Sequence, residues 1–280
     1  MAKWGKNEEP APGELRVHRH CGQETGQYID FMGFNGFRGS VLSSFKAHRP
    51  DGAWGWLPSR CAICQRWPQA PLCDACVSQF AEPVPRCTTC ALPLPGLAKR
   101  CGICLKTPPP LDLCLTATTY GWPWAELIAR FKFQQQPGWA GPLATLMLSA
   151  PWAENLLEAA DWVLPIPLSI ERLSERGYNQ AGLLAQKLCP QKANARLLLR
   201  TRDTPSQRSL PRTERLANLA GAFAVEPLLA AQLRGKKVVL VDDVMTSGAS
   251  LHMAARELRR AGVTHVSALV LARTEADRTD

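Results

Sequence analysis

The stretch that decides the fold is Val238-Val239-Leu240-Val241-Asp242-Asp243-Val244-Met245-Thr246-Ser247-Gly248-Ala249-Ser250. Its first four residues are all apolar, which predicts a buried strand. The residues from Asp242 to Ser250 predict a polar turn. The stretch therefore places two adjacent carboxylates at the end of a buried strand, directly before hydroxyl residues and a glycine.

A helix and a second strand are predicted after this turn. Residues 251–261 predict the helix, because apolar side chains recur at the spacing of one helical face (Leu251, Ala254, Ala255 and Leu258). Gly262 predicts the end of the helix, and residues 266–271 form the next apolar run. A strand, a helix and a strand in this order place the two strands parallel in one sheet. Parallel sheets of this kind bind ligands at the carboxyl ends of their strands.

The turn has the composition of a sugar-phosphate site. Backbone N–H groups at a helix N-terminus can bind a phosphate, and Gly248 permits its close approach. Asp242 and Asp243 would repel that phosphate unless hydroxyls or cations lay between them, and a sugar phosphate supplies such hydroxyls. An ordinary Ser or Thr helix cap is the alternative. A triphosphatase acid pair is excluded, because the chain has no G-x-x-x-x-G-K-[ST] stretch.

The stretch 242–250 resembles the phosphoribosyl pyrophosphate (PRPP) motif of type I phosphoribosyltransferases. The resemblance implies that Asp242 and Asp243 hold the ribose hydroxyls and that a loop binds the 5′-phosphate, with Mg²⁺ on the pyrophosphate. It also disfavours hypoxanthine and guanine as acceptors, because enzymes for 6-oxopurines carry an acid at the position of Thr246. The implied phosphate loop is Thr246, Ser247, Gly248, Ala249 and Ser250.

Two further stretches resemble the ComF/GntX family, whose members are associated with competence and the use of external DNA. One is Pro165-Ile166-Pro167-Leu168 with Arg172 and Arg176-Gly177-Tyr178-Asn179-Gln180, and the other runs from Gln207 to Phe223. Phe131-Lys132-Phe133 matches an early helix of that family. The resemblance covers about residues 61–272. It implies a parallel-sheet type I phosphoribosyltransferase-like domain of the α/β class, preceded by a small zinc-ribbon module.

Phosphoribosyl transfer develops negative charge on pyrophosphate, so a cationic clamp is expected beside the Mg²⁺. Residues 196–215 contain six Arg against two acids and predict a mobile lid over the pyrophosphate, with a solvated loop or a nucleic-acid contact as alternatives. Residues 170–188 predict one helix. Its arginines could reach pyrophosphate or form ion pairs with Glu171 and Glu175. The predicted pyrophosphate and lid residues are Pro167, Leu168, Arg172, Arg176, Gln207, Arg212 and Arg215.

Eight of the eleven cysteines form four Cys-x-x-Cys pairs between residues 61 and 104. Two such pairs complete a tetrahedral four-thiolate site, so the spacing predicts about two structural zinc ions. A redox dithiol and iron–sulfur ligation are the alternatives. Sequential pairing, which we favour, gives two ribbons, whereas alternate pairing gives a cross-brace. The predicted ligands are Cys61, Cys64, Cys73, Cys76, Cys87, Cys90, Cys101 and Cys104.

Composition and sequence pattern also predict the location and the domain organisation of the protein. The first 20 residues have no apolar stretch of the secretory kind, and no run approaches a membrane span, so we expect a cytoplasmic protein. We expect residues 1–60 to be a poorly ordered extension, 61–110 a double zinc ribbon and 111–280 the phosphoribosyltransferase-like domain.

The net charge of +9 suits either nucleic acid or a phosphorylated small molecule. The expected function is a PRPP-using enzyme with an unidentified acceptor, in nucleotide salvage or DNA utilisation. The alternatives are a non-catalytic PRPP sensor or a factor that binds single-stranded DNA or DNA-uptake proteins.

Overall fold

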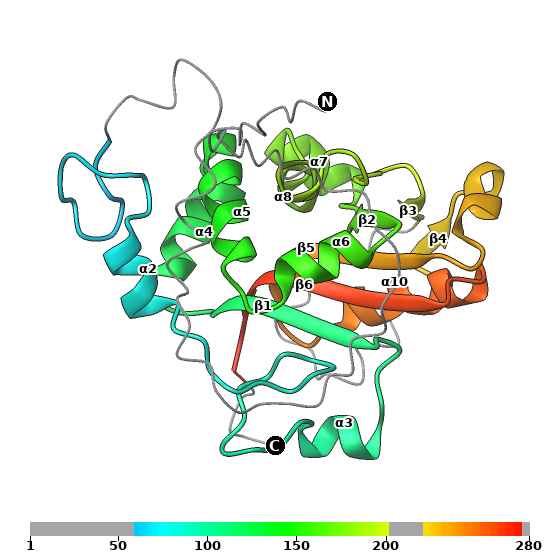
Figure 1. Cartoon of the computed structure of the whole chain (residues 1–280). Helices are drawn as coiled ribbons and strands as arrows, with labels where there is room; N and C mark the ends of the chain where they lie inside the picture. Colours follow the sequence, from blue (N-terminus) through cyan, green and yellow to red (C-terminus); the bar gives the residue numbers. More distant parts are fainter. Residues whose placement is uncertain (1–58, 202–220, 276–280) are drawn as a thin grey trace, which may run out of the picture.

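The computed structural model describes residues 59–201 and 221–275 (Figure 1). Nearly all of the predicted N-terminal extension and most of the predicted lid lie outside these residues. Within them, no helix is long and apolar enough to cross a membrane.

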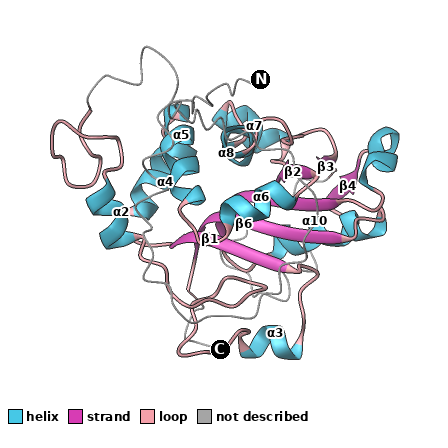
Figure 2. Ribbon diagram, in the orientation of Figure 1, coloured by secondary structure: helices cyan, strands magenta, loops and turns pink. Residues whose placement is uncertain are grey.

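A four-stranded parallel sheet forms the centre of the molecule (Figure 2). Its strand order is β1-β6-β5-β2, and every neighbouring pair is parallel. The strands are β1 (Leu113–Thr119), β2 (Trp162–Pro165), β5 (Lys237–Met245) and β6 (His265–Arg273). Parallel pairing brings the carboxyl ends of all four strands to one edge, as the sequence predicted.

The predicted strand-helix-strand unit is confirmed, but its boundaries differ. Strand β5 continues through both acids to Met245, because Asp242 pairs with Val270 and Val244 with Ala272 of β6. Helix α10 spans Ala249–Arg260 and so begins two residues before the predicted start. The turn is therefore shorter than 242–250, and the acids project from a paired strand.

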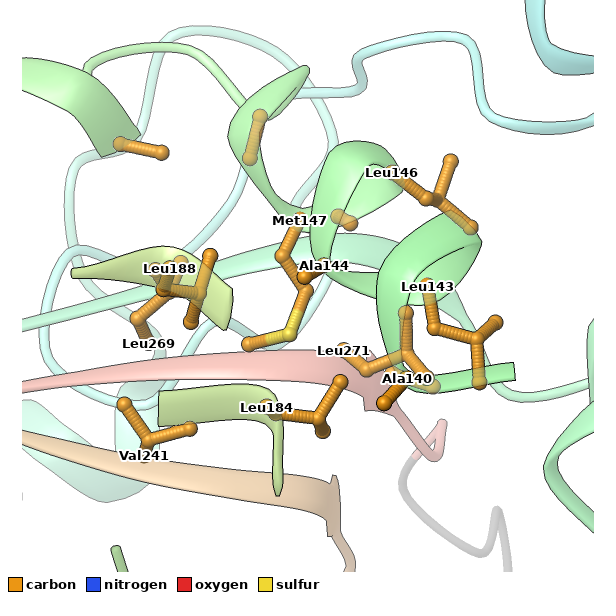
Figure 3. Packing of buried hydrophobic residues seen from close by; sticks show 14 of the residues in the cluster. Ala140, Leu143, Ala144, Leu146, Met147, Leu184, Leu188, Val241, Leu269 and Leu271 are labelled. Carbon is orange, nitrogen blue, oxygen red and sulfur yellow. The ribbon is translucent and has the colours of Figure 1, made fainter. Parts of the chain in front are cut away.

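The two faces of the sheet bury alternate residues of β5. Val239 and Val241 face a core formed with helices α4 (Trp124–Phe133), α5 (Ala140–Leu148), α6 (Ala153–Ala159) and α8 (Gln180–Leu188). Val238 and Leu240 face the opposite core, which includes α10. Figure 3 shows the first core, where Met147 of α5 and Leu184 of α8 approach Val241 and Leu269 of the sheet. Helices thus cover both faces.

The prediction of one helix over 170–188 is wrong. The structure contains α7 (Ile170–Arg176) and α8, separated at Gly177. Gly177 has φ +78°, a left-handed conformation that favours glycine and ends a helix. Asn179 then caps α8, because its Oδ1 accepts a hydrogen bond from the Gly182 N–H at 3.3 Å.

Smaller elements complete the described chain. A two-stranded antiparallel sheet pairs β3 (Leu198–Arg200) with β4 (Phe223–Val225). Short 3₁₀ turns, η2 (Pro137–Trp139) and η3 (Pro227–Leu233), follow α4 and β4. The cysteine region contributes the short helices α2 (Asp74–Phe80) and α3 (Gly102–Lys106).

The two halves of the cysteine region pack in different places. Cysteines 87, 90, 101 and 104 belong to the same buried cluster as Leu240 of β5 and Leu258 of α10. Cys61, Cys73 and Cys76 form a separate small cluster with Phe80. In Figure 1, α2 lies beside α4, whereas α3 lies on the other side of the sheet. The second half of the cysteine region therefore shares its core with the sheet.

Candidate active site

The predicted acid pair lies at the carboxyl end of β5, in the middle of the sheet. Asp243 is only 6% exposed, and its Oδ1 lies 2.8 Å from Nζ of Lys132 at the end of α4. The backbone N–H of Asp243 donates to Oδ1 of Asp242 at 2.9 Å. One lysine thus faces two carboxyl groups, so ionisation of both would leave one negative charge unbalanced.

The electrostatic environment of this acid pair favours the binding of a cation or of hydroxyl donors. Burial, and then the charge of Asp243, raise the pKa of Asp242 to about 8, although Lys132 acts in the opposite direction. A carboxyl group with a raised pKa gains more than an ordinary one from a ligand that stabilises its charged form. Strongly shifted acids in such a position are typical of functional sites.

The predicted phosphate loop follows directly and leads into α10. Gly248 has φ +79°, and a Cβ atom there would come within 2.5 Å of the Met245 methyl carbon and 3.0 Å of the His252 ring. The Ala249 N–H donates to Oγ of Ser247 at 3.4 Å. The left-handed backbone therefore favours glycine, and an added Cβ would displace the end of the Met245 side chain and press on the His252 ring. The loop brings the N-terminus of a twelve-residue helix to the acid pair.

Arg273, at the end of β6, holds this loop from beneath. Its side chain is buried and donates to the carbonyl oxygens of Met245 at 3.1 Å, Thr246 at 2.5 Å and Thr274 at 2.7 Å. The guanidinium therefore fixes the carbonyl oxygens of Met245 and Thr246, and with them the orientation of the peptide groups that begin the loop.

The neighbouring loop after β2 carries the predicted Pro167 and Leu168. Strand β2 ends at Pro165, and the Ile166 N–H donates to the Val241 carbonyl at 2.9 Å. This bond anchors the start of the loop one residue before the acid pair in β5.

Helix α7 then presents the two predicted arginines. The Arg176 guanidinium lies 5.0 Å from the centre of the Phe133 ring and donates to Oε1 of Gln180 at 3.0 Å. Burial lowers the pKa of Arg176, whereas the negative charge of Asp243 acts to raise it. Among the ion pairs of the described residues, none joins Arg172 or Arg176 to Glu171 or Glu175. Arg176 therefore lies within electrostatic reach of Asp243 and of Glu175, but within the described residues neither arginine forms the ion pair that a salt-bridged helix surface would require.

Three predicted lid residues fall outside the described part of the chain, so their positions stay predictions. They are Gln207, Arg212 and Arg215.

The cysteine pairs assemble sequentially into two tetrads, as predicted. Within each tetrad the four sulfur atoms lie within 4.8 Å of one another. Four thiolates at this spacing fit structural zinc. The first tetrad is Cys61, Cys64, Cys73 and Cys76, and the second is Cys87, Cys90, Cys101 and Cys104.

One thiol in each tetrad has a lowered pKa, whereas burial raises the pKa values of Cys73, Cys76, Cys90 and Cys104. Burial opposes the ionisation of Cys61 and Cys87, but hydrogen bonds from neighbouring groups outweigh it and lower the pKa of each thiol to about 6. The Cys101 N–H, for example, donates to Sγ of Cys87 at 3.3 Å. Thiolates are the ligand form of cysteine, so the lowered thiol of each tetrad supplies one anionic ligand, and the spacing of the four sulfur atoms supplies the fit to a metal ion.

Two functional candidates were missed by sequence reasoning. Lys132 was placed in an early helix but given no role, because its partner Asp243 lies 111 positions further along the chain. Arg273 is a charged residue that directly continues an apolar strand, and this break in the pattern is the signal that could have identified it.

The parallel sheet, with an acid pair and a glycine turn at its carboxyl edge, is the arrangement expected of the phosphoribosyltransferase class. Residues 149–280 match the family model described as phosphoribosyl transferase domain. The sequence prediction of this fold is confirmed.

Relatives identify the family more narrowly. Competence protein F of Haemophilus influenzae is 35% identical over 210 residues, which cover 72% of this chain and 90% of that protein. DNA utilization protein YhgH of Escherichia coli is 32% identical over 230 residues, with 78% and 98% covered. Competence protein ComFC of Bacillus subtilis is 33% identical over 157 residues, with 56% and 62% covered. The chain belongs to the ComF family of competence and DNA-utilisation proteins.

Proposed function

We propose that this chain binds PRPP together with Mg²⁺ at the carboxyl edge of its sheet and transfers the phosphoribosyl group to an acceptor. The observation that carries the proposal is the acid pair, with buried Asp243 and its single lysine, directly before a glycine loop and a helix N-terminus. A sugar phosphate has hydroxyls that can bind the acid pair and a phosphate that can bind the glycine loop and the helix N-terminus.

In this proposal each side chain has a defined task. Asp242 and Asp243 accept hydrogen bonds from the ribose hydroxyls, and the amides of residues 247–249 bind the 5′-phosphate. Lys132 holds Asp243 in place through its 2.8 Å ion pair. Carboxylate oxygens also suit Mg²⁺, which supplies positive charge to the leaving pyrophosphate when bound. Arg176 and the predicted lid add to that charge and exclude water.

The names of the relatives supply the wider context. Two are called competence proteins and one a DNA utilization protein. We infer a role in the use of DNA or its nucleotide products for this chain, with single-stranded DNA or uptake proteins as candidate partners. A sensor that binds PRPP without consuming it is the second candidate function.

A double variant tests the assignment of the site. Asp242→Asn with Asp243→Asn keeps the size of both side chains but removes their charge, so Mg-PRPP binding in isothermal titration should be abolished. Glu158→Gln, at an exposed position on α6, serves as the matched control and should bind like the wild type. Wild-type affinity in the double variant would contradict the site. Pyrophosphate release in a screen of bases then separates an enzyme from a sensor.

A further inference from the structure

Arg273 has an unusual environment for a charged side chain. It is 7% exposed, and its Nε donates to a main-chain carbonyl. Its Nη1, which has two hydrogens to share, lies within hydrogen-bond distance of three further carbonyl oxygens and of the Thr274 hydroxyl. Among the ion pairs of residues 59–201 and 221–275, none includes Arg273. A buried guanidinium is tolerated only where hydrogen bonds satisfy it, so its several carbonyl partners fix its position.

The carbonyls that Arg273 joins belong to two separate functional segments. On one side are Met245 at 3.1 Å and Thr246 at 2.5 Å, which begin the phosphate loop. On the other side is the carbonyl of Cys90, which accepts from Nε at 2.8 Å. Cys90 also supplies a sulfur atom to the second tetrad. One side chain therefore connects a metal-ligand residue to the loop over a chain separation of more than 150 positions.

Other contacts tie the same cysteine loop to the same end of the sheet. The Cys114 N–H of β1 donates to the Thr88 carbonyl at 2.7 Å, and Sγ of Cys114 lies 3.6 Å from Sδ of Met245. Arg86 donates to the Ala91 carbonyl at 3.1 Å and to Oγ1 of Thr119 at 2.8 Å. The loop around the second tetrad is thus braced against β1 and β5.

The first tetrad is attached elsewhere. The carbonyl of Phe80, in the helix that carries Cys76, accepts a hydrogen bond from Nε1 of Trp124 at 2.7 Å. This contact leads to α4 and the other face of the sheet. The first tetrad can therefore serve as an internal control for the second. Among the described residues, Arg273 hydrogen-bonds to a cysteine of the second tetrad and to none of the first.

We propose that Arg273 is a positioning residue that couples metal occupancy of the second tetrad to the phosphate affinity of the loop. A metal ion on Sγ of Cys90 fixes the backbone of that residue, including its carbonyl. The carbonyl in turn fixes Arg273, which holds the Met245 and Thr246 carbonyls so that the amides after them face the phosphate. The identity of that phosphate as PRPP rests on the proposed function, whereas the coupling itself does not.

Hydrogen–deuterium exchange tests the coupling without any ligand. Arg273→Gln and Cys104→Ser should each increase amide exchange in residues 246–250. Cys76→Ser should increase exchange around residues 59–80 and not in the loop. Thermal melting of every variant shows whether the chain still folds, and Arg273→Lys, which keeps the charge, should restore part of the protection. Unchanged exchange in the loop of Arg273→Gln would overturn the proposal, as would an equal loop response to Cys76→Ser.

Titration with Mg-PRPP supplies the second readout. Arg273→Gln should weaken binding about tenfold, the equivalent of one charge-assisted hydrogen bond. Cys104→Ser should weaken binding in the wild-type background but add less than about twofold to Arg273→Gln, because coupled residues are not additive. Additive losses would refute the route through Arg273. If the wild type does not bind PRPP, the proposed function fails, and the exchange experiment alone decides the coupling.

Discussion

Gly248 offers the sharpest test of the phosphate loop, through the variant Gly248→Ala. Its φ of +79° lies in the left-handed region, where a Cβ atom is unfavourable. The added Cβ would also lie 2.5 Å from the Met245 methyl carbon and 3.0 Å from two ring atoms of His252. The Met245 methyl is the end of a flexible side chain and can rotate away, but both side chains are buried, so this shift and that of the His252 ring must be accommodated inside the core.

The expected loss of stability has two parts. The left-handed conformation costs about 1–2 kcal/mol for a residue with a Cβ atom. Overpacking against buried side chains adds about 1–3 kcal/mol. Gly177→Ala separates the two, because Gly177 has φ +78° but a Cβ atom added there would have no neighbouring atom within 4 Å. The control should therefore lose only the first part.

The assay is urea unfolding of both variants, followed by circular dichroism, with Mg-PRPP titration of the folded proteins. Gly248→Ala should lose about 2–5 kcal/mol of unfolding free energy and bind PRPP at least tenfold more weakly. Gly177→Ala should lose about 1–2 kcal/mol. Equal stability losses in the two variants would refute the steric argument. Unchanged PRPP affinity in Gly248→Ala would refute the role of the loop.

Three further predictions concern the acid pair and the cysteines. Lys132→Met leaves Asp243 buried without its partner, so the unfolding free energy measured in urea should fall by about 3 kcal/mol. The loss of the positive charge should also move the pH profile of Mg-PRPP binding to higher pH. A wild-type profile would contradict the role of the ion pair. The raised pKa of Asp242 means that the folded chain keeps a proton that the unfolded chain releases, so the contribution of this residue to stability should decrease as pH rises from 3.8 to about 8. Asp242→Asn should remove that dependence, which melting temperatures across this range would measure. Elemental analysis should find about two zinc ions per chain, and a chelator should lower the melting temperature; iron, or no metal, would contradict zinc in the tetrads.

Sequence reasoning succeeded where the signal is local. The apolar run at Val238, the helical spacing after Gly248 and the Cys-x-x-Cys pairs each specify a unit within about fifteen residues, and the structure contains all three. Sequential pairing of the tetrads was favoured and is confirmed, but the spacing alone did not decide it, because the segments between successive pairs are 8, 10 and 10 residues long.

Sequence reasoning failed where a distant partner or a single backbone angle determines the boundary of an element or the role of a side chain. The continuation of β5 through Asp242 depends on pairing with β6, which a local pattern of polar residues does not reveal. The break at Gly177 depends on one left-handed residue inside an otherwise helical stretch. Lys132 and Arg273 acquire their roles only when the sheet brings them to Asp243 and to the phosphate loop.

The central claim is that the carboxyl edge of this sheet binds PRPP. Isothermal titration of the metal-loaded wild-type chain with Mg-PRPP tests it most directly, with ribose 5-phosphate as competitor. We predict saturable binding with one site per chain and displacement by the competitor, because both compounds carry the 5′-phosphate for the loop. An absence of saturable binding in the folded protein would contradict the account.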